Sequence, residues 1–190
     1  HRDLHSFPTR RSSDLYQSMY SSTGGLFNVA VGSLSFMNNT NGNANVAVGH
    51  YALNSNTTGW MNIAIGQTAM QNNTTGGYNV GIGDHSLNLN TVGRNNVATG
   101  MAAMQNNTEG SNNTALGSYS LNKNTVGEHN TAVGSGALTE DTTGSYNTAV
   151  GSKSSLKNKT GSNNVSVGLN SLSENISGNS NIAIGENALY

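Results

Sequence analysis

The sequence predicts an all-β fold, a parallel β-solenoid (β-roll) of about ten 17-residue coils with no globular core. The first observation is a strict period: an Asn recurs every 17 residues from Asn28 to Asn181, and a Gly follows four residues after each one. The second is that each copy has β-branched residues at alternate positions of a short segment such as 45–48, which is typical of a strand. The third is that Gly, Asn and Thr clusters separate these segments and leave no room for a helix of three turns.

Residues 42–58 represent one copy, and each position forms a column of equivalent residues through the array. We expect a short strand at 45–48, a corner at Gly49, a second short extended stretch around Ala52 and Leu53, and an Asn-Thr-Thr-Gly turn. Successive coils in parallel pairing lie about 4.8 Å apart, so ten coils would give a rod roughly 48 Å long.

The apolar columns predict the core but allow two arrangements. The column of Val48 is apolar in every copy except Thr99, so we expect it to be buried. Ala47's column is Ala in every copy except at Gly81 and Ser166, so that face has room only for a very small side chain. The Leu53 column is large until Ser155, where the following Leu156 suggests a local slip. In a wide monomeric roll, Val and Ile would point inward with Leu53. In a narrow roll, Ala would fill the coil and the Val/Ile stripe would meet other chains on a symmetry axis, which requires an oligomer such as a trimer.

The repeated Gly and Asn positions are predicted to be structural. The Gly at each strand end predicts a corner with positive φ or a close backbone approach, and Gly59 with its equivalents closes a turn. The Asn columns of Asn45 and Asn56 are expected to satisfy turn backbone groups and to stack in ladders. The repeat positions assigned in this way are Asn45, Gly49, Asn62, Gly66, Asn79, Gly83, Asn96 and Gly100.

The ends of the chain differ from the array. Residues 1–15 hold the only Pro and share nothing with the repeat, and residues 5–15 resemble a translated sequencing adapter. We therefore expect 1–15 to be a non-biological, disordered scar that stays outside fold reasoning. Residues 16–25 form a transitional segment, and 26–190 form the array, which stops partway through a copy and predicts an internal fragment.

Composition excludes several classes of function. The net charge is −1 with no basic patch, which argues against nucleic-acid binding. No apolar run is long enough to predict membrane insertion, and the absence of Cys excludes disulfides and thiolate metal sites. The net charge is near zero and the apolar residues recur in phase, which argues against disorder.

No catalytic, cofactor-binding or metal-binding residue is predicted, and the chain is not expected to be an enzyme. His50, His85 and His129 belong to separate coils, whereas a metal site needs several matched ligands. Glu140 and Asp141 adjoin, but we interpret them as solvated turn residues and not as an acid/base pair. The Gly-rich segments also lack the Gly-Lys-Ser/Thr of a phosphate-binding loop.

The variable positions of the copies are where binding could be encoded without damage to the core. Aromatic side chains at these positions suit stacking against sugar rings or protein ligands, although they could equally cover the coil as ordinary surface residues. The possible ligand-contact residues are Tyr51, Trp60, Tyr78, Tyr119 and Tyr146.

The strand segments resemble a known family of repeats. The sequences Asn-Val-Ala-Val-Gly at 45–49, Asn-Ile-Ala-Ile-Gly at 62–66 and Asn-Thr-Ala-Val-Gly at 130–134 are each followed by Ala or Ser three positions on. These residues resemble the head repeats of YadA-like trimeric autotransporter adhesins and related repeats of phage tail fibres. The resemblance implies a left-handed parallel β-roll, a homotrimer, display outside the cell or on a virion, and attachment to a host-surface protein or glycan. The adhesin repeat is a few residues shorter, and the extra length here falls in the Asn-Thr-Thr-Gly turn.

Two functions are therefore expected from the sequence. The first is a structural and adhesive rod of a surface adhesin or tail-fibre-like protein. The alternative is an ice- or carbohydrate-surface-binding β-solenoid, suggested by a column of Thr residues that could match a regular ligand. This column comprises Thr40, Thr57, Thr74, Thr91, Thr108, Thr125 and Thr142, and Lys159 and Ile176 interrupt it.

Overall fold

The computed structural model describes residues 16–190, and within them it contains ten strands and no helix. All ten strands form one parallel sheet in chain order. They are β1 (Val29–Val31), β2 (Val46–Val48), β3 (Ile63–Ile65), β4 (Val80–Ile82), β5 (Val97–Thr99), β6 (Thr114–Leu116), β7 (Thr131–Val133), β8 (Thr148–Val150), β9 (Val165–Val167) and β10 (Ile182–Ile184). The predicted parallel β-solenoid is therefore confirmed. The interpretation of residues 1–15 as a scar falls outside the described residues.

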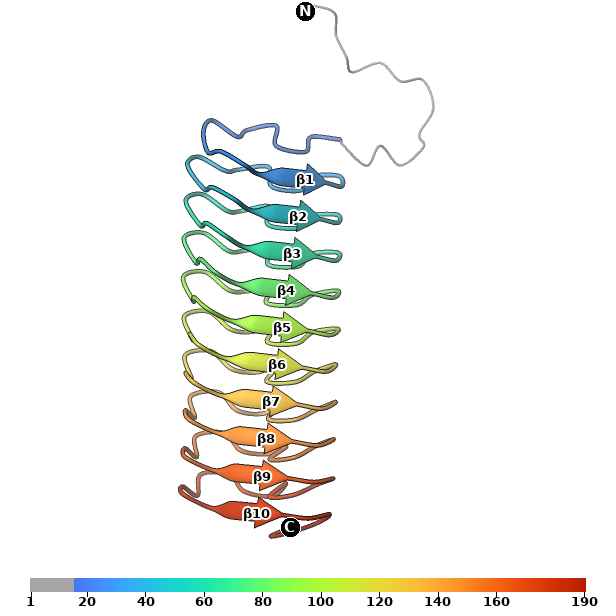
Figure 1. Cartoon of the computed structure of the whole chain (residues 1–190), viewed down its shortest axis with the longest axis vertical. Helices are drawn as coiled ribbons and strands as arrows, with labels where there is room; N and C mark the ends of the chain where they lie inside the picture. The colour runs from blue at the N-terminus through green and yellow to red at the C-terminus, as the bar shows by residue number, and fades with distance from the viewer. Residues whose placement is uncertain (1–15) are drawn as a thin grey trace, which may run out of the picture.

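The coils stack with a constant shift of one sequence period. Ala47 of β2 pairs with Ala64 of β3, and the other strand pairs keep the same register. Each strand ends at a Gly with φ between 123° and 136°. In Figure 1 the strands run from left to right on the near side, the chain returns behind them, and it descends towards its C-terminus. This path is a left-handed coil, as the resemblance to adhesin heads implies.

The segment that returns from each strand is a series of tight turns. In the coil of β2, the Ala52 N–H donates to the Gly49 carbonyl at 3.2 Å, and the Asn54 N–H donates to the Tyr51 carbonyl at 3.3 Å. The third residues of these two turns, Tyr51 and Leu53, have φ of 58° and 49°, as type II turns require. The prediction of an extended stretch around Ala52 and Leu53 is therefore wrong, because the left-handed residues fold this stretch into consecutive turns.

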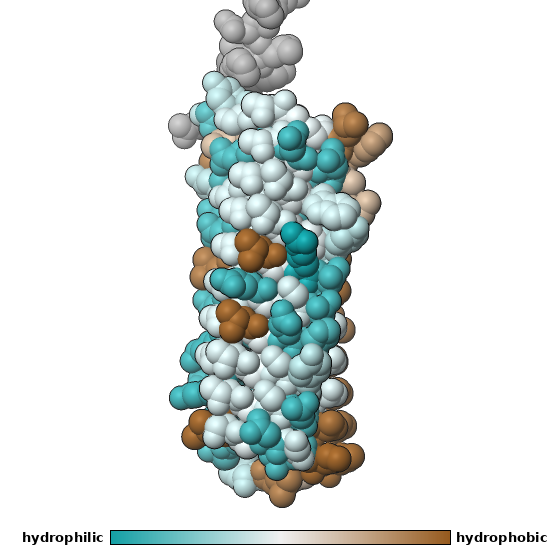
Figure 2. Space-filling view, turned by 90° about the vertical axis from the view of Figure 1, so that its left-hand side faces the viewer, coloured by the Kyte–Doolittle hydropathy of each residue, from teal (hydrophilic) through white to brown (hydrophobic). Residues whose placement is uncertain are grey.

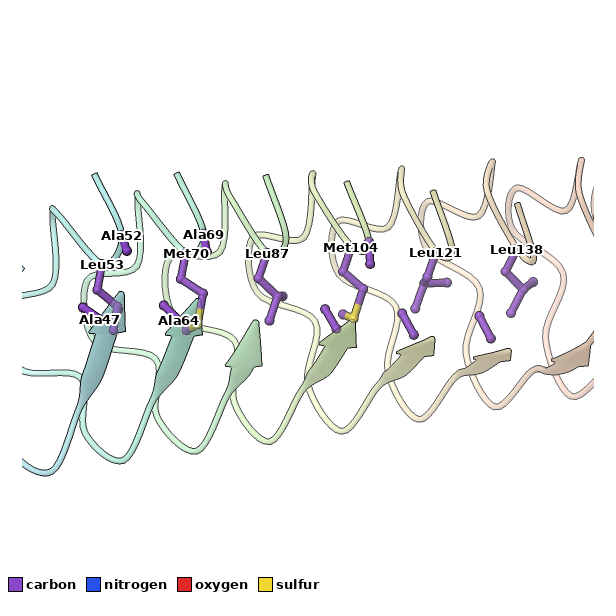
Figure 3. Packing of buried hydrophobic residues seen from close by; sticks show 14 of the residues in the cluster. Ala47, Ala52, Leu53, Ala64, Ala69, Met70, Leu87, Met104, Leu121 and Leu138 are labelled. Atoms are coloured by element: carbon purple, nitrogen blue, oxygen red, sulfur yellow. The ribbon is translucent and has the colours of Figure 1, made fainter. Parts of the chain in front are cut away.

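The core is a narrow column between the sheet and the return segment. Ala47 and Leu53 are both fully buried, and in Figure 3 Leu53 and Met70 project from the return segment towards the Ala residues of the strands. The structure thus has the narrow arrangement, with Ala inside. The expectation that the Val48 column is buried is wrong for the single chain: its members Ile65 and Ile82 are 38% and 37% exposed. Because alternate side chains of a strand point to opposite faces, Val and Ile point outward when Ala points inward.

The coil that contains Ser155 keeps the register of the others. Ser155 is 2% exposed and has φ of 50°, like Leu53. Its Oγ lies 2.8 Å from Ser166 Oγ, and Ser154 Oγ lies 2.6 Å from the same atom. The predicted slip at Ser155 and Leu156 is wrong, because hydrogen bonds to Ser166 satisfy the buried hydroxyl groups in the unchanged register.

Two columns of buried Asn side chains run through the stack. In the first, the Asn45 ladder, Asn62 Nδ2 donates to the Gly76 carbonyl at 2.9 Å and the Asn62 N–H donates to Asn45 Oδ1 at 3.0 Å. In the second, the Asn56 ladder, Asn73 Nδ2 donates to Asn56 Oδ1 at 2.8 Å and to the Gly76 carbonyl at 3.1 Å. Each amide therefore joins two coils and satisfies turn groups that would otherwise be buried without partners.

Residues 16–25 stack on the first complete coil. The Leu34 N–H donates to the Tyr16 carbonyl at 2.8 Å, and the Met19 N–H donates to the Ser35 carbonyl at 3.1 Å. Met19 also packs against the end of the core. The stack thus extends above β1 by part of a coil.

Candidate functional site

The outer surface of the sheet is an apolar feature that runs along the rod. We call it the strand face, and it consists of the side chains at the positions of Val46 and Val48 in each of the ten coils of residues 16–190. Figure 2 shows apolar side chains recurring down the margin on the side where the strands lie. Within the stack Ile63 is 37% exposed, and at its lower end Ile184 is 70% exposed. The strand face is two columns wide and interrupted only by Thr residues, namely Thr99, Thr114, Thr131 and Thr148.

Two edges border the strand face. The leading edge comprises the two positions before each strand's Asn, such as Asn43 and Ala44, and the trailing edge comprises the two positions after each strand-end Gly, such as His50 and Tyr51. The five aromatic residues predicted as ligand contacts are divided between these edges. Trp60, Tyr78 and Tyr146 lie on the leading edge, whereas Tyr51 and Tyr119 lie on the trailing edge, four coils apart. The structure therefore does not gather them into one site.

One pair of the predicted residues does come together. The ring centroids of Trp60 and Tyr78, in adjacent coils, lie 4.5 Å apart with the planes tilted by 60°. In the coil of Tyr78, Gly77 stands at the position equivalent to Trp60. A Cβ at Gly77 would lie 3.0 Å from Trp60 Nε1, so the absence of a side chain there makes room for the indole ring. Trp60 and Tyr78 remain 39% and 45% exposed. We call Trp60, Gly77 and Tyr78 the aromatic platform.

The other predicted aromatic residues have different neighbours. Tyr146 stacks on His129 of the preceding coil, with centroids 4.9 Å apart and planes at 5°. Tyr51 meets His50 edge to face at 4.3 Å. His129 was not predicted as a contact residue. The period of 17 could have indicated it, because His129 and Tyr146 occupy equivalent positions of adjacent coils.

The hydroxyl groups of the Thr column are used inside the stack. Thr57 Oγ1 donates to the Thr74 carbonyl at 3.0 Å, and Thr91 Oγ1 donates to the Thr108 carbonyl at 3.0 Å. The other members, from Thr40 to Thr142, make the same bond to the next coil. The hydroxyl protons of this column therefore hold the turns together and are not directed at a ligand.

Comparison with known proteins adds no assignment. The chain matches no protein-family model, no curated protein and no solved structure. Among residues 16–190, no helix is long and apolar enough to cross a membrane. Function must therefore be argued from the surface and the interior of the rod.

Ionisable groups do not converge on a site in the described part of the chain. Residues 16–190 contain no group of three or more His, Asp or Glu side chains that could hold a metal ion. Lys123, Glu140, Lys157 and Glu174 occupy one column in four successive coils and form ion pairs: Lys123 Nζ lies 2.9 Å from Glu140 Oε1, and Lys157 Nζ lies 2.8 Å from Glu174 Oε2. The hydrogen bond from Lys123 lowers the pKa of Glu140, and the bond to Glu174 raises that of Lys157. These are exposed structural pairs of adjacent coils.

Asp141 is the one acidic side chain buried among residues 16–190, and its interpretation as a solvated turn residue is wrong. It occupies an Asn position of the Asn56 ladder, inside the turn, where the backbone of its own coil and the side chains of the next enclose it. Gly144 N–H donates to Asp141 Oδ1 at 2.7 Å, and Asn158 Nδ2 donates to Oδ2 at 3.2 Å. The sequence signal was available, because Asp141 is the single acidic residue in the column of Asn56.

Proposed function

We propose that the chain is the structural and adhesive rod of an extracellular attachment protein, displayed on a cell surface or a virion as a homotrimer. The observation that carries this proposal is the strand face, a continuous apolar surface along the whole stack of β1–β10. The resemblance to YadA-like heads and tail-fibre repeats supports the same reading.

The strand face gives the physical reason for assembly. Scattered apolar side chains are normal on a protein surface, but a contiguous stripe of them marks an interface. Ile65 and Ile82 lie in adjacent paired strands, so their exposed areas are continuous along the rod. Three parallel rods with these faces on a common axis would cover the stripe on every copy, and closed symmetry would leave none of it free.

The test is the oligomeric state of two matched variants. In Ile65→Glu, a trimer would place three carboxylates on its axis, and such buried unpaired charges are strongly destabilising. In Leu89→Glu, the same charge replaces a side chain of nearly equal exposure, 39% against 38%, in a turn column away from the strand face. We expect light scattering to give a trimer for the wild type and Leu89→Glu, and dissociation or lost thermal stability for Ile65→Glu. A wild-type monomer, or two variants that behave alike, would refute assembly through this face.

Attachment is assigned to the edges, where Trp60 and Tyr78 are 39% and 45% exposed in the single chain. The aromatic platform is the best candidate, because two large rings from adjacent coils present apolar faces with polar tips to solvent. Tyr and Trp rings supply large contact areas at little conformational cost, and this suits sugar rings as well as protein ligands. Repetition in a trimer would present three platforms at one height and would raise the avidity for a multivalent surface.

Glycan-array binding tests the platform. We expect the wild-type rod to retain particular glycans and the double variant Trp60→Ala, Tyr78→Ala to lose at least about tenfold in affinity, since each lost stacking contact is worth on the order of 1 kcal/mol. The single variant Tyr119→Ala is the control, because Tyr119 has similar exposure, 46%, but lies on the trailing edge without an aromatic neighbour. Equal binding by the double variant and the control would remove the platform from the proposal.

The alternative of ice binding through the Thr column is not favoured by any observation. Its hydroxyl groups already donate to carbonyl oxygens of the next coil. Lys159 and Ile176 also interrupt the column. Carbohydrate binding, the other part of that alternative, is retained because sugars are among the ligands proposed for the aromatic platform.

A further inference from the structure

The Asn56 ladder is a one-way chain of hydrogen bonds. From Asn56 to Asn124, each side-chain amide donates to the Oδ1 of the Asn one coil earlier, at distances from 2.7 to 3.1 Å. The members from Asn39 to Asn107 also accept from the coil that follows them. The ladder therefore requires a side chain that both donates and accepts in every coil, and Asn meets this requirement.

At Asp141 the chain of donors is broken. An ionised carboxylate accepts hydrogen bonds but has no proton to donate. Asn124 Oδ1, which faces the next coil, accordingly has no hydrogen-bond partner although it is buried. Both Asp141 oxygens are directed at donors instead: Oδ1 accepts from the Gly144 N–H at 2.7 Å, and Oδ2 accepts from Asn147 and Asn158 at 3.2 Å.

We propose that this junction is a pH-sensitive seam in the rod: a proton on Asp141 completes the Asn56 ladder by donation to Asn124 Oδ1, and loss of that proton loosens the contact between the two coils. A protonated carboxyl group has one O–H donor and keeps acceptor capacity, so it can replace the amide in both roles. The proposal is independent of the oligomeric state and of the ligand.

The surroundings of Asp141 favour the protonated form. Asn side chains and the turn backbone contact the carboxyl group, and no charged group of residues 16–190 bonds to it. Of the neighbouring charged residues, Glu140 adjoins Asp141 in sequence and is paired with Lys123, and Lys159 is exposed. Burial raises the pKa of Asp141 from 3.8 to about 6, and the three hydrogen bonds oppose this increase without cancelling it.

The sign of the pH effect follows from this direction. Below pH 4, Asp141 is protonated whether the junction is closed or open, so the full stability of the closed form is present. As the pH rises from about 4 to about 6, the open form loses its proton first, and the closed form becomes progressively less favoured. Above pH 6 both forms are ionised and the loss is complete. A difference of about two pKa units corresponds to about a 100-fold change in the opening equilibrium.

The seam lies beside the least apolar part of the core. Asn158, which donates to Asp141, belongs to the same coil as Ser155, where a buried Ser replaces the large apolar side chain of the other coils, and Ser166 lies in the coil that follows. Local opening concentrates where few apolar contacts hold the structure. The coil that follows Asp141 therefore offers it fewer apolar contacts, whereas Leu121 and Leu138 are buried on the two sides of the seam itself.

Native-state hydrogen exchange of the whole chain tests the proposal. The amides of Thr125 and Val126 donate across the junction to the Thr142 carbonyl and report its opening. The reference is Asp141→Asn, which restores the residue found at equivalent positions of the array. We expect the protection of these amides in the wild type, relative to this variant at the same pH, to fall by up to about 100-fold between pH 4 and pH 7. Equal protection ratios at both pH values would overturn the proposal.

Two further measurements keep the result decisive if Asp141→Asn does not fold. Carboxyl-carbon NMR of the wild type should give Asp141 a titration midpoint near 6, and a midpoint near 4 would overturn the proposal. The double variant Asn107→Asp, Asp141→Asn should transfer the pH-dependent protection to amides two coils nearer the N-terminus. Glu140→Gln is the neighbouring control: because the pKa of Glu140 is lowered, its loss should weaken the rod at neutral pH and weaken it less as the pH falls, so its pH dependence is opposite in sign to that of Asp141.

Discussion

Gly66 and Gly136 are both left-handed glycines, but only one occupies a position that excludes a side chain. Gly66 ends β3 with φ of 135°, and a Cβ there would lie 2.5 Å from the Gly83 carbonyl O of the next coil. The positive φ disfavours any side chain at this position. The short contact also excludes one, because the contacted atoms belong to the backbone and cannot move aside as a flexible side chain would. We expect Gly66→Ala to lower the free energy of unfolding by about 1–3 kcal/mol, measured as a shift in the denaturant midpoint.

Gly136→Ala is the matched control at the residue scale. Gly136 has φ of 71°, in the region that Tyr51, Thr68 and Tyr119 adopt in the same column, and its nearest non-neighbouring atom would lie 3.4 Å from a Cβ. An Ala fits there and also restricts the unfolded chain, so we expect a change of about 1 kcal/mol or less in either direction. Comparable losses in the two variants would show that the strand-end Gly is not specifically required.

At the level of the element, the strand could be predicted and the return segment could not. The alternation around Val46 and Val48, the fixed period and the strand-end Gly all point to a short strand in a parallel stack. The segment at Tyr51 and Leu53 gave no such signal, because bulky residues rarely adopt positive φ and no sequence rule assigns them to it. Bonds from neighbouring coils enforce that conformation here, and such tertiary constraints are not encoded within one copy.

The choice of inner face was also beyond the sequence. Val-Ala-Val is apolar on both faces, so alternation cannot say which one points inward, and only the narrow width set by Leu53 selects the small Ala. The candidate functional surface could likewise be predicted only in part from the sequence. The aromatic residues could be named, but only the stacking of coils brings Trp60 to Tyr78 and separates both from Tyr119. Asp141 could have been found, since a single acidic residue in a column of Asn is visible in the sequence.

For the whole molecule, the stack behaves as a one-dimensional array. Each coil contacts its neighbours through the same bonds: the paired strands, the two Asn ladders and the Thr hydroxyl groups. The described stack contains no contact between strands that are not consecutive. In such an array stability is approximately a sum over coils and the interfaces between them, so coils can be added or removed as units.

Deletion of a single coil tests this property. Removing residues 76–92 takes out one full period and joins Thr75 to Gly93, so every column continues across the junction. We expect the shortened rod to keep its β-sheet circular dichroism and to lose about a tenth of its denaturant m-value, because that value scales with the surface exposed on unfolding. Removing residues 76–91 instead shifts all later columns by one position and turns the Val/Ile face inward. In that variant the coils after the junction should no longer stack on those before it. An intact fold would show that a constant register along the whole rod is not required for the structure.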